Sequence, residues 1–367
     1  MKKLLFILVW TVFVSACQTM QTVVNKAADI GKETVANVKN IPLLKNKESN
    51  TVAKDDDTEN VVKEALVIVD KHSYESPLTV NDRLCTEIVS PFKLEKNIDK
   101  IISEAAKKGA ESVATNVVLG KKEDSEEVAL NTAKAEAKKS NWLTMKYEKK
   151  IGWEYHEKRL EEGLSVIDRK RKGKRTKRLY DKADKLLARV VASIEEEHPY
   201  KFEVILINNS DVNATALPGG YIYVNTGVLK SPSAELVIGH EVAHVLKRHE
   251  TYETQAHMID LVDSVDHLKK LVTADEKQYE KIIARLVNYF GSVDNFSKQQ
   301  ELQSDACAVR IAGKIPDTNI AVMIDSFIKS IEDTKGAKKD RDGHPNYPER
   351  RKTMEEVSKK MLAVASR

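Results

Sequence analysis

Two histidines one helical turn apart, with a glutamate beside the first, are the residues of this sequence best suited to chemistry. In the string His240-Glu241-Val242-Ala243-His244, both histidines share one face of a helix, so both rings can reach a single ion. Glu241 is rotated by about 100° from His240 and lies beside the ion, where a base for a water molecule belongs. The pattern predicts metal-assisted hydrolysis with Zn2+ as the metal. The alternative is a structural helix that carries the same string without a metal.

A third protein ligand for the metal is expected further along the chain. In Glu301-Leu302-Gln303-Ser304-Asp305 the two carboxylates are four residues apart and share a helix face. One of them can bind the metal while the other fixes a histidine ring through a hydrogen bond. Taken alone this pair is weak evidence, because acidic pairs at this spacing usually form solvated faces.

The elements that must position these residues follow from the hydrophobic pattern. Ser231 is a plausible N-cap, and Pro232 the first residue, of the helix that carries both histidines. Apolar runs predict strands over 201–208 and 220–224. Together with a helical block over 142–197, this order predicts an α+β fold that is mainly helical with a small sheet. The later helices are expected over 233–250, 253–270, 275–290, 297–312, 318–334 and 348–364.

Four ordered motifs make the chain resemble a known family. They are Asn213-Ala214 through Leu217-Pro218-Gly219-Gly220, the HEVAH helix extended to His249, the ELQSD string, and His344-Pro345 with Glu349-Arg350. The chain resembles the HtpX/BepA/LoiP group of zinc metallopeptidases, gluzincins that include the CAAX prenyl proteases. The resemblance implies a gluzincin-type metalloprotease domain over 141–367, with one zinc per chain and polypeptide substrates.

Carried over residue by residue, the resemblance makes Glu301 the third zinc ligand and Asp305 the partner of a ligating histidine. Ser304 stands where the family usually has alanine, a small-for-small change. The resemblance also implies misfolded or misassembled envelope proteins as substrates. A zinc-bearing chaperone or assembly factor, and a binding lipoprotein with a vestigial site, are the alternatives.

Other candidate site residues surround these motifs. Pro218-Gly219-Gly220 permits a tight turn, and the strand after it could be an exposed sheet edge that pairs with an extended peptide. An ordinary core hairpin is the alternative to that cleft. His249 is interpreted as supporting the site or as structural, and His344 as an oxyanion donor or a surface histidine. Arg350 is interpreted as steadying the loop that carries His344, or the cleft, through a carboxylate. The residues assigned to the cleft are Asn213, Gly219, Gly220 and Tyr221.

The N-terminus suggests a bacterial lipoprotein. Lys2 and Lys3 precede a short apolar run, and Val14-Ser15-Ala16-Cys17 resembles a lipobox, with an ordinary secretory signal as the alternative. We therefore expect a signal peptide over 1–16, lipidation at Cys17, a flexible tether over 17–60 and a mostly helical region of unknown role over 61–140. Gln18 favours the outer membrane, facing the periplasm.

Composition limits the partners. Lys plus Arg is 60 and Asp plus Glu is 56, so the net charge is only +4, which argues against a nucleic-acid binder. Eight of the ten residues from Arg169 to Arg178 are basic, which suits either an anionic partner such as a lipid head group or a plain solvated surface. Of the three cysteines, Cys85 and Cys307 could pair in an oxidising envelope, and the sequence leaves that open.

Overall fold

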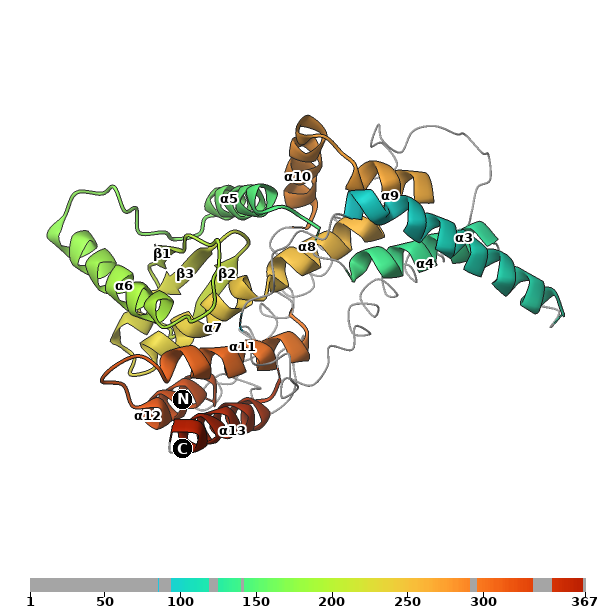
Figure 1. The fold of residues 1–367 in the computed structure, drawn as a ribbon. Coiled ribbons are helices and arrows are strands. Elements are labelled where there is room, and N and C mark those ends of the chain that lie inside the picture. The colour runs from blue at the N-terminus through green and yellow to red at the C-terminus, as the bar shows by residue number, and fades with distance from the viewer. Residues whose placement is uncertain are drawn as a thin grey trace, which may run out of the picture. The chain divides into compact units, whose positions relative to one another are not determined.

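The computed structural model describes Cys85 and residues 94–118, 125–139, 142–290, 296–332 and 345–365. Its three strands, β1 (Glu203–Ile207), β2 (Ala214–Leu217) and β3 (Tyr221–Asn225), form one small sheet among many helices (Figure 1). β3 lies in the middle, parallel to β1 and antiparallel to β2. The predicted mainly helical α+β fold with a small sheet is confirmed.

The sheet separates two hydrophobic cores because successive strand residues face opposite sides. Val204, Leu206 and Val224 pack with helices α6 (Lys174–Ala192), α7 (Ala234–Leu246) and α11 (Lys298–Ala312). Ile205 and Tyr223 face the other core, together with α5 (Met145–Glu161). That second core also takes in the helices α3 (Leu94–Val118), α4 (Ser125–Lys138), α8 (His249–Asp260), α9 (Val265–Val272) and α10 (Glu276–Phe290).

The first core is closed by the C-terminal helices. α12 (Ile320–Glu332) contributes Ile324 and Phe327, and α13 (Tyr347–Ala365) contributes Met354 and Val357. A short 3-10 helix, η3 (Val228–Lys230), leads from β3 to α7. Figure 1 shows α7 beside the sheet, with α11, α12 and α13 following on its far side.

Several predicted boundaries were wrong, each for a local reason. The helix expected over 233–250 ends at Leu246, because Arg248 takes the left-handed conformation at φ 55° before α8 begins. The helix expected over 253–270 is split into α8 and α9, and the Ser264 side chain caps α9 by accepting from the His267 amide. α7 starts at Ala234 with Ser233 as its N-cap, two residues later than predicted. Finally, β2 was not predicted as a strand.

A disulfide joins Cys85 to Cys307 on α11, with their Cα atoms 5.5 Å apart. Both cysteines are buried in the first core. Within the described residues, no helix is both long and apolar enough to cross a membrane. Cys17 and the rest of residues 1–84 lie outside the described part, so the predicted leader and tether stay predictions.

Candidate metal centre

Helix α7 holds the two histidines rigidly because it is buried on every side. All thirteen residues from Ala234 to Leu246 are buried, among them His240, Glu241 and His244. Helix α11 packs directly on α7 at Gly239, where an added Cβ would be in ordinary contact with the Cα of Ala308, 3.6 Å away. The close approach of the two helices brings the side chain of Glu301 towards both histidines.

Three potential ligand atoms converge between α7 and α11. His240 Nε2 lies 3.4 Å from Glu301 Oε2, and His244 Nε2 lies 3.6 Å from Glu301 Oε1. The two Nε2 atoms are 3.1 Å apart. One atom from each of these three residues lies within 4.8 Å of the others, and all three residues are buried. The cluster can therefore hold one metal ion.

The start of α11 is fixed by its own sequence. Ser297 and Gln300 form a capping box, in which each side chain accepts a hydrogen bond from the other residue's backbone amide. Gln300 also donates from its side chain to Glu253 on α8 at 3.1 Å. These bonds set where the first turn of α11 begins, and thereby place Glu301 opposite α7.

Asp305 orients the first histidine. Its Oδ1 lies 2.9 Å from His240 Nδ1, so Nδ1 keeps its proton and Nε2 faces the cluster, where a metal can take the place of a proton. Arg350, from the first turn of α13, donates to both oxygens of Asp305 at 2.6 and 2.7 Å. Its guanidinium also lies 5.0 Å from the ring centre of Phe327. Arg350 thus steadies a carboxylate, as expected from sequence, although it does so from a helix.

Glu241 is held from the sheet side. Its Oε2 accepts a hydrogen bond of 2.8 Å from the backbone amide of Ala216 on β2. Burial raises the pKa of Glu241 to about 7, and the negative charge of Glu301 acts in the same direction. A carboxylate with such a pKa can take up and release a proton near neutral pH.

His244 is packed by residues on two further elements. His249 at the start of α8 places its Nδ1 3.1 Å from His244 Nδ1, and its Nε2 lies 3.2 Å from Gln303 Oε1. The ring of Phe296 lies 4.1 Å from that of His244, centre to centre. Sequence reasoning missed Phe296; its apolar side chain directly before the capping Ser297 was the available signal.

The electrostatics of the cluster favour a cation. Burial alone would lower the pKa of His240, but its hydrogen bonds with Asp305 and Glu301 raise the pKa to about 10. Burial and the neighbouring His240 hold the pKa of His244 well below its ordinary value, so this ring stays neutral and able to bind a metal. Two imidazoles and one carboxylate are the donor set of a zinc site with an open fourth position.

The residues assigned to a substrate cleft are placed differently. β3 is the central strand, so the prediction that the strand after Gly220 forms the sheet edge was wrong; the edge strands are β1 and β2. Gly219 and Tyr221 lie against α5: Gly219 donates weakly to Glu148, and the Tyr221 ring packs near Trp153. Gly220 has a φ of 98° and approaches Lys201, while Asn213 accepts from the amide of Asn225.

The turn between β2 and β3 is anchored by a buried ion pair that the sequence did not reveal. Arg248 donates from two nitrogens to Glu148 on α5, at 2.9 and 3.2 Å, and both side chains are at most 1 % exposed. Glu148 also accepts from the hydroxyl of Tyr200 at 3.0 Å. The turn and α5 touch so closely that a Cβ on Gly152 would lie 1.9 Å from the Pro218 carbonyl oxygen.

His344, which the sequence suggested as an oxyanion donor, lies outside the described residues.

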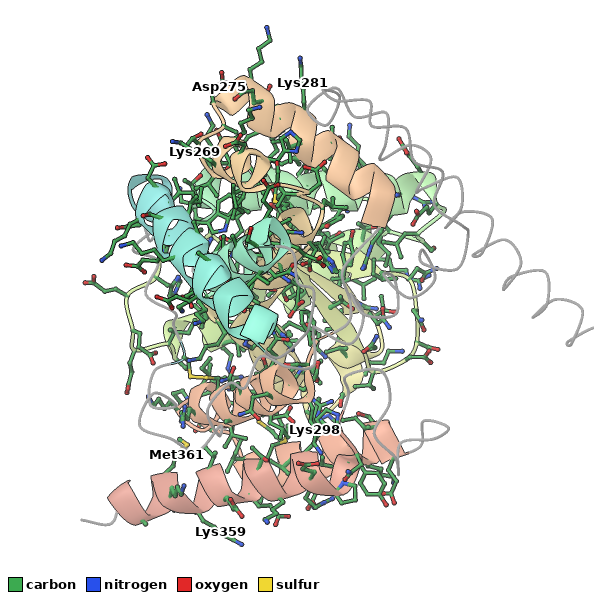
Figure 2. The ribbon with its side chains drawn as sticks, turned by 90° about the vertical axis from the view of Figure 1, so that its right-hand side faces the viewer. Lys269, Asp275, Lys281, Lys298, Lys359 and Met361 are labelled. Atoms are coloured by element: carbon green, nitrogen blue, oxygen red, sulfur yellow. A yellow bond between two sulfur atoms is a disulfide. The ribbon has the colours of Figure 1, made fainter. Side chains whose placement is uncertain are left out.

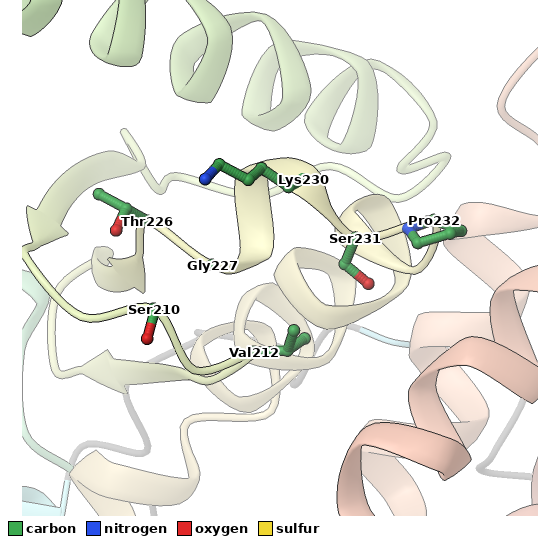
Figure 3. A pocket seen from close by; sticks show the side chains of 7 residues that line it. All are labelled: Ser210, Val212, Thr226, Gly227, Lys230, Ser231 and Pro232. Carbon is green, nitrogen blue, oxygen red and sulfur yellow. The ribbon is translucent and has the colours of Figure 1, made fainter.

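A pocket of about 320 Å³ is lined by none of the three residues of the metal cluster, His240, His244 and Glu301. It is formed by the loops that flank β2 and β3 and by the segment leading to α7. Figure 3 shows Ser210 and Val212 below Thr226 and Lys230, with Ser231 and Pro232 at one end. Its lining contains no histidine or carboxylate, so it lacks the groups that hydrolysis would need.

Comparison with known proteins agrees with this geometry. The family model for peptidase family M48 matches residues 174–358, half of the chain. The matched segment runs from the start of α6 into α13 and includes His240, His244, Glu301, Asp305 and Arg350. No curated protein matches the sequence.

Proposed function

The chain belongs to peptidase family M48, and from that premise we propose that it is a zinc-dependent endopeptidase of the bacterial cell envelope. Membership of the family supports a peptidase function. The single observation that carries the zinc-dependent mechanism is the buried cluster of His240, His244 and Glu301, whose donor atoms all lie within 4.8 Å of one another.

These three residues would hold the zinc ion. When bound, zinc supplies the Lewis acid that makes water acidic enough to attack a peptide carbonyl near neutral pH. Asp305 keeps the proton of His240 on Nδ1, and Arg350 holds the Asp305 carboxylate in place. These contacts fix the ligands before the metal binds, which limits the conformational entropy lost on metal binding.

Glu241 is the proposed general base. Its carboxylate accepts a proton from the attacking water, and then delivers that proton to the leaving amine. The Ala216 amide holds one oxygen, Oε2, and leaves the other for this exchange. His344, as the proposed oxyanion donor, remains a prediction.

The edge of β2 is the proposed docking site for a substrate strand. Because the Ala216 amide donates to Glu241, it points away from β3, and strand alternation places the polar backbone groups of Ala214 on the same open side. An extended peptide could pair with those groups beside Glu241 by main-chain hydrogen bonds, which tolerate many sequences. Such tolerance suits misfolded or misassembled envelope proteins as substrates.

A test compares Glu241→Gln with wild type for zinc content and casein hydrolysis. The amide cannot accept a proton, so kcat should fall about a hundred- to ten-thousand-fold while zinc content is unchanged. Chelation should abolish hydrolysis in the wild type, and added zinc should restore it. Glu235→Gln is the matched control, since Glu235 is a buried carboxylate on the same helix that pairs with Arg189.

Wild-type turnover by Glu241→Gln would rule out this residue as the base. The alternative function, a zinc-bearing chaperone or assembly factor with little proteolysis, predicts a different result. In that case Glu241→Gln would still rescue envelope defects in cells that lack the protein, whereas a peptidase variant without its base would not.

Lipidation at Cys17 is proposed as the membrane anchor, with the mature protein on the outer membrane facing the periplasm. Several acyl chains on one cysteine would hold the protein stably on a bilayer. Labelled palmitate should enter the wild-type protein and not Cys17→Ser, and the variant should leave the membrane fraction. An unchanged, membrane-bound, processed Cys17→Ser protein would contradict the lipobox.

A further inference from the structure

The surface formed by the loop before α6 and the first turns of α6 carries a concentrated positive charge. Of its ten residues, 169–178, eight are basic and none is acidic, so the segment carries +8. The whole chain carries only +4, and the remaining residues therefore sum to −4. We refer to this segment as the basic surface. The positive charge is therefore concentrated in this segment, while the rest of the chain is slightly negative.

Most of these charges have no partner. Arg169 is the exception in the loop, because it pairs with Asp184 at 2.8 Å and lies over the Tyr180 ring. Lys177 pairs with Asp181 at 2.7 Å. Within the described residues the other six basic side chains make no hydrogen bond or ion pair, and all six are exposed. They are Lys170, Arg171, Lys172, Lys174, Arg175 and Arg178.

The fold anchors the helix that carries part of the basic surface, and it places these cations there at some cost to its own stability. The opposite face of α6 is anchored in the first core by Tyr180, Ala183, Leu187 and Val190. The first turn of α6 contains basic residues and no acidic one, and the positive end of the helix dipole disfavours cations there. A surface that is fixed in place, unneutralised and slightly destabilising is well suited to an anionic partner.

We propose that the basic surface docks the peptidase domain on an anionic phospholipid membrane. Clusters of four to eight Lys or Arg bind acidic lipid head groups by electrostatic attraction. The segment 169–178 contains no aromatic residue, whereas proteins that bind single-stranded nucleic acids stack bases on exposed aromatic rings. The leader predicted before Cys17 would also bring the protein to a membrane.

The proposed contact complements an acyl anchor. An anchor at Cys17 followed by a long polar tether would leave the domain free to move away from the bilayer. Electrostatic contact through the basic surface holds the domain against the head groups and restricts its orientation. The contact is independent of peptidase chemistry, because none of its cations belongs to the metal cluster.

The experiment measures sedimentation of the mature chain, residues 17–367, with lipid vesicles. The protein carries Cys17→Ser so that no acyl chain contributes. It should bind vesicles of phosphatidylcholine mixed with phosphatidylglycerol, and not vesicles of phosphatidylcholine alone. At 1 M salt, where the screening length is about 3 Å, binding should disappear. Changing the six unpaired cations to Gln should weaken binding by at least tenfold, because each of these cations contributes to the attraction.

A control variant loses the same charge elsewhere. It replaces six exposed lysines with Gln on α9, α10, α12 and α13, two of which, Lys281 and Lys359, are labelled in Figure 2. The six are Lys270, Lys277, Lys281, Lys329, Lys359 and Lys360. This variant should bind anionic vesicles nearly as well as the parent protein, and both variants should keep wild-type zinc content and thermal unfolding.

Three results would overturn the proposal. Equal loss of binding in both variants would show that only net charge matters. Binding to neutral vesicles that resists salt would show that the basic surface is not the contact. Tighter binding of the parent protein to single-stranded RNA than to anionic vesicles, lost in the basic-surface variant alone, would make nucleic acid the partner.

Discussion

Helices α6 and α7 pack against the same face of the sheet, yet their charged and polar side chains lie in opposite environments. Every residue of α7 is buried, and its two histidines and Glu241 are each matched by a partner on another element. Only one face of α6 is buried, and most cations of its first turns face solvent unpaired. Burial forces polar groups into fixed geometry, which catalysis needs. Exposure leaves the charges of α6 free to contact a partner that has no fixed geometry, such as a membrane.

The largest effect is expected where a buried ion pair is broken beside the metal cluster. Arg350→Ala leaves the fully buried Asp305 without its guanidinium partner. The free energy of unfolding should fall by about 3–5 kcal/mol, because an uncompensated buried charge remains. Urea unfolding measures the loss, and zinc titration should show about a tenfold to hundredfold weaker affinity.

Arg351→Ala is the matched control on the same helix. Arg351 is partly exposed and pairs with Asp325 at the surface, so its loss should cost at most about 1 kcal/mol. Equal losses in the two variants would contradict the claim that the Arg350 pair is energetically distinct.

Sequence reasoning placed His240, Glu241 and His244 on one helix, as α7 has them, because these residues and their helix belong to one local pattern. The spacing of Glu301 and Asp305 likewise indicated that both face one side of α11, as they do. β2 was missed because its four residues, Ala214–Leu217, are too short to show alternation. Its contact with Glu241 is a long-range backbone bond that leaves no trace in composition.

The break between α7 and α8 was also invisible in the sequence. No Gly or Pro interrupts the segment, and only tertiary contact explains why Arg248 adopts a left-handed backbone. Its guanidinium reaches Glu148 one hundred residues earlier in the chain. A single sequence contains no information about that pairing, although two charges near helix ends are visible in it.

A second, smaller effect should appear as a pH dependence of stability. Burial raises the pKa of Glu253 on α8 from 4.5 to about 7. Between these values the unfolded chain has released the proton that folded Glu253 retains, so this group lowers stability as the pH rises from about 4.5 to 7. Across that pH range, the free energy of unfolding of Glu253→Gln should therefore rise relative to that of the wild type by roughly 1–3 kcal/mol.

Urea unfolding at a series of pH values measures this difference. Glu127→Gln, at an exposed position on α4, is the control and should follow the wild-type curve. A difference between Glu253→Gln and wild type that does not change with pH would show that the carboxyl group keeps its charge in the folded protein.

The smallest effect is expected on α6, where a substitution should raise the free energy of unfolding, in contrast to Arg350→Ala. Arg175→Glu places an acidic residue in the first turn, where the helix dipole favours negative charge. The free energy of unfolding should rise by about 0.3–1 kcal/mol, while binding to anionic vesicles weakens. Lys185→Glu, in the middle of the helix, should show no such gain. A loss of stability in Arg175→Glu would mean that the cation has an internal partner.

The bond between Cys85 and Cys307, which are 222 positions apart in the sequence, closes this part of the chain into a covalent ring. His240, His244 and Glu301 all lie within this ring, whereas α12 and α13, with Arg350, follow it. A single backbone cut inside the ring, including one made by another copy of the enzyme, leaves both pieces joined. Such a nicked molecule would run as one chain on a denaturing gel until it is reduced, while a cut after Cys307 would leave Arg350 and its helix held by non-covalent contacts alone.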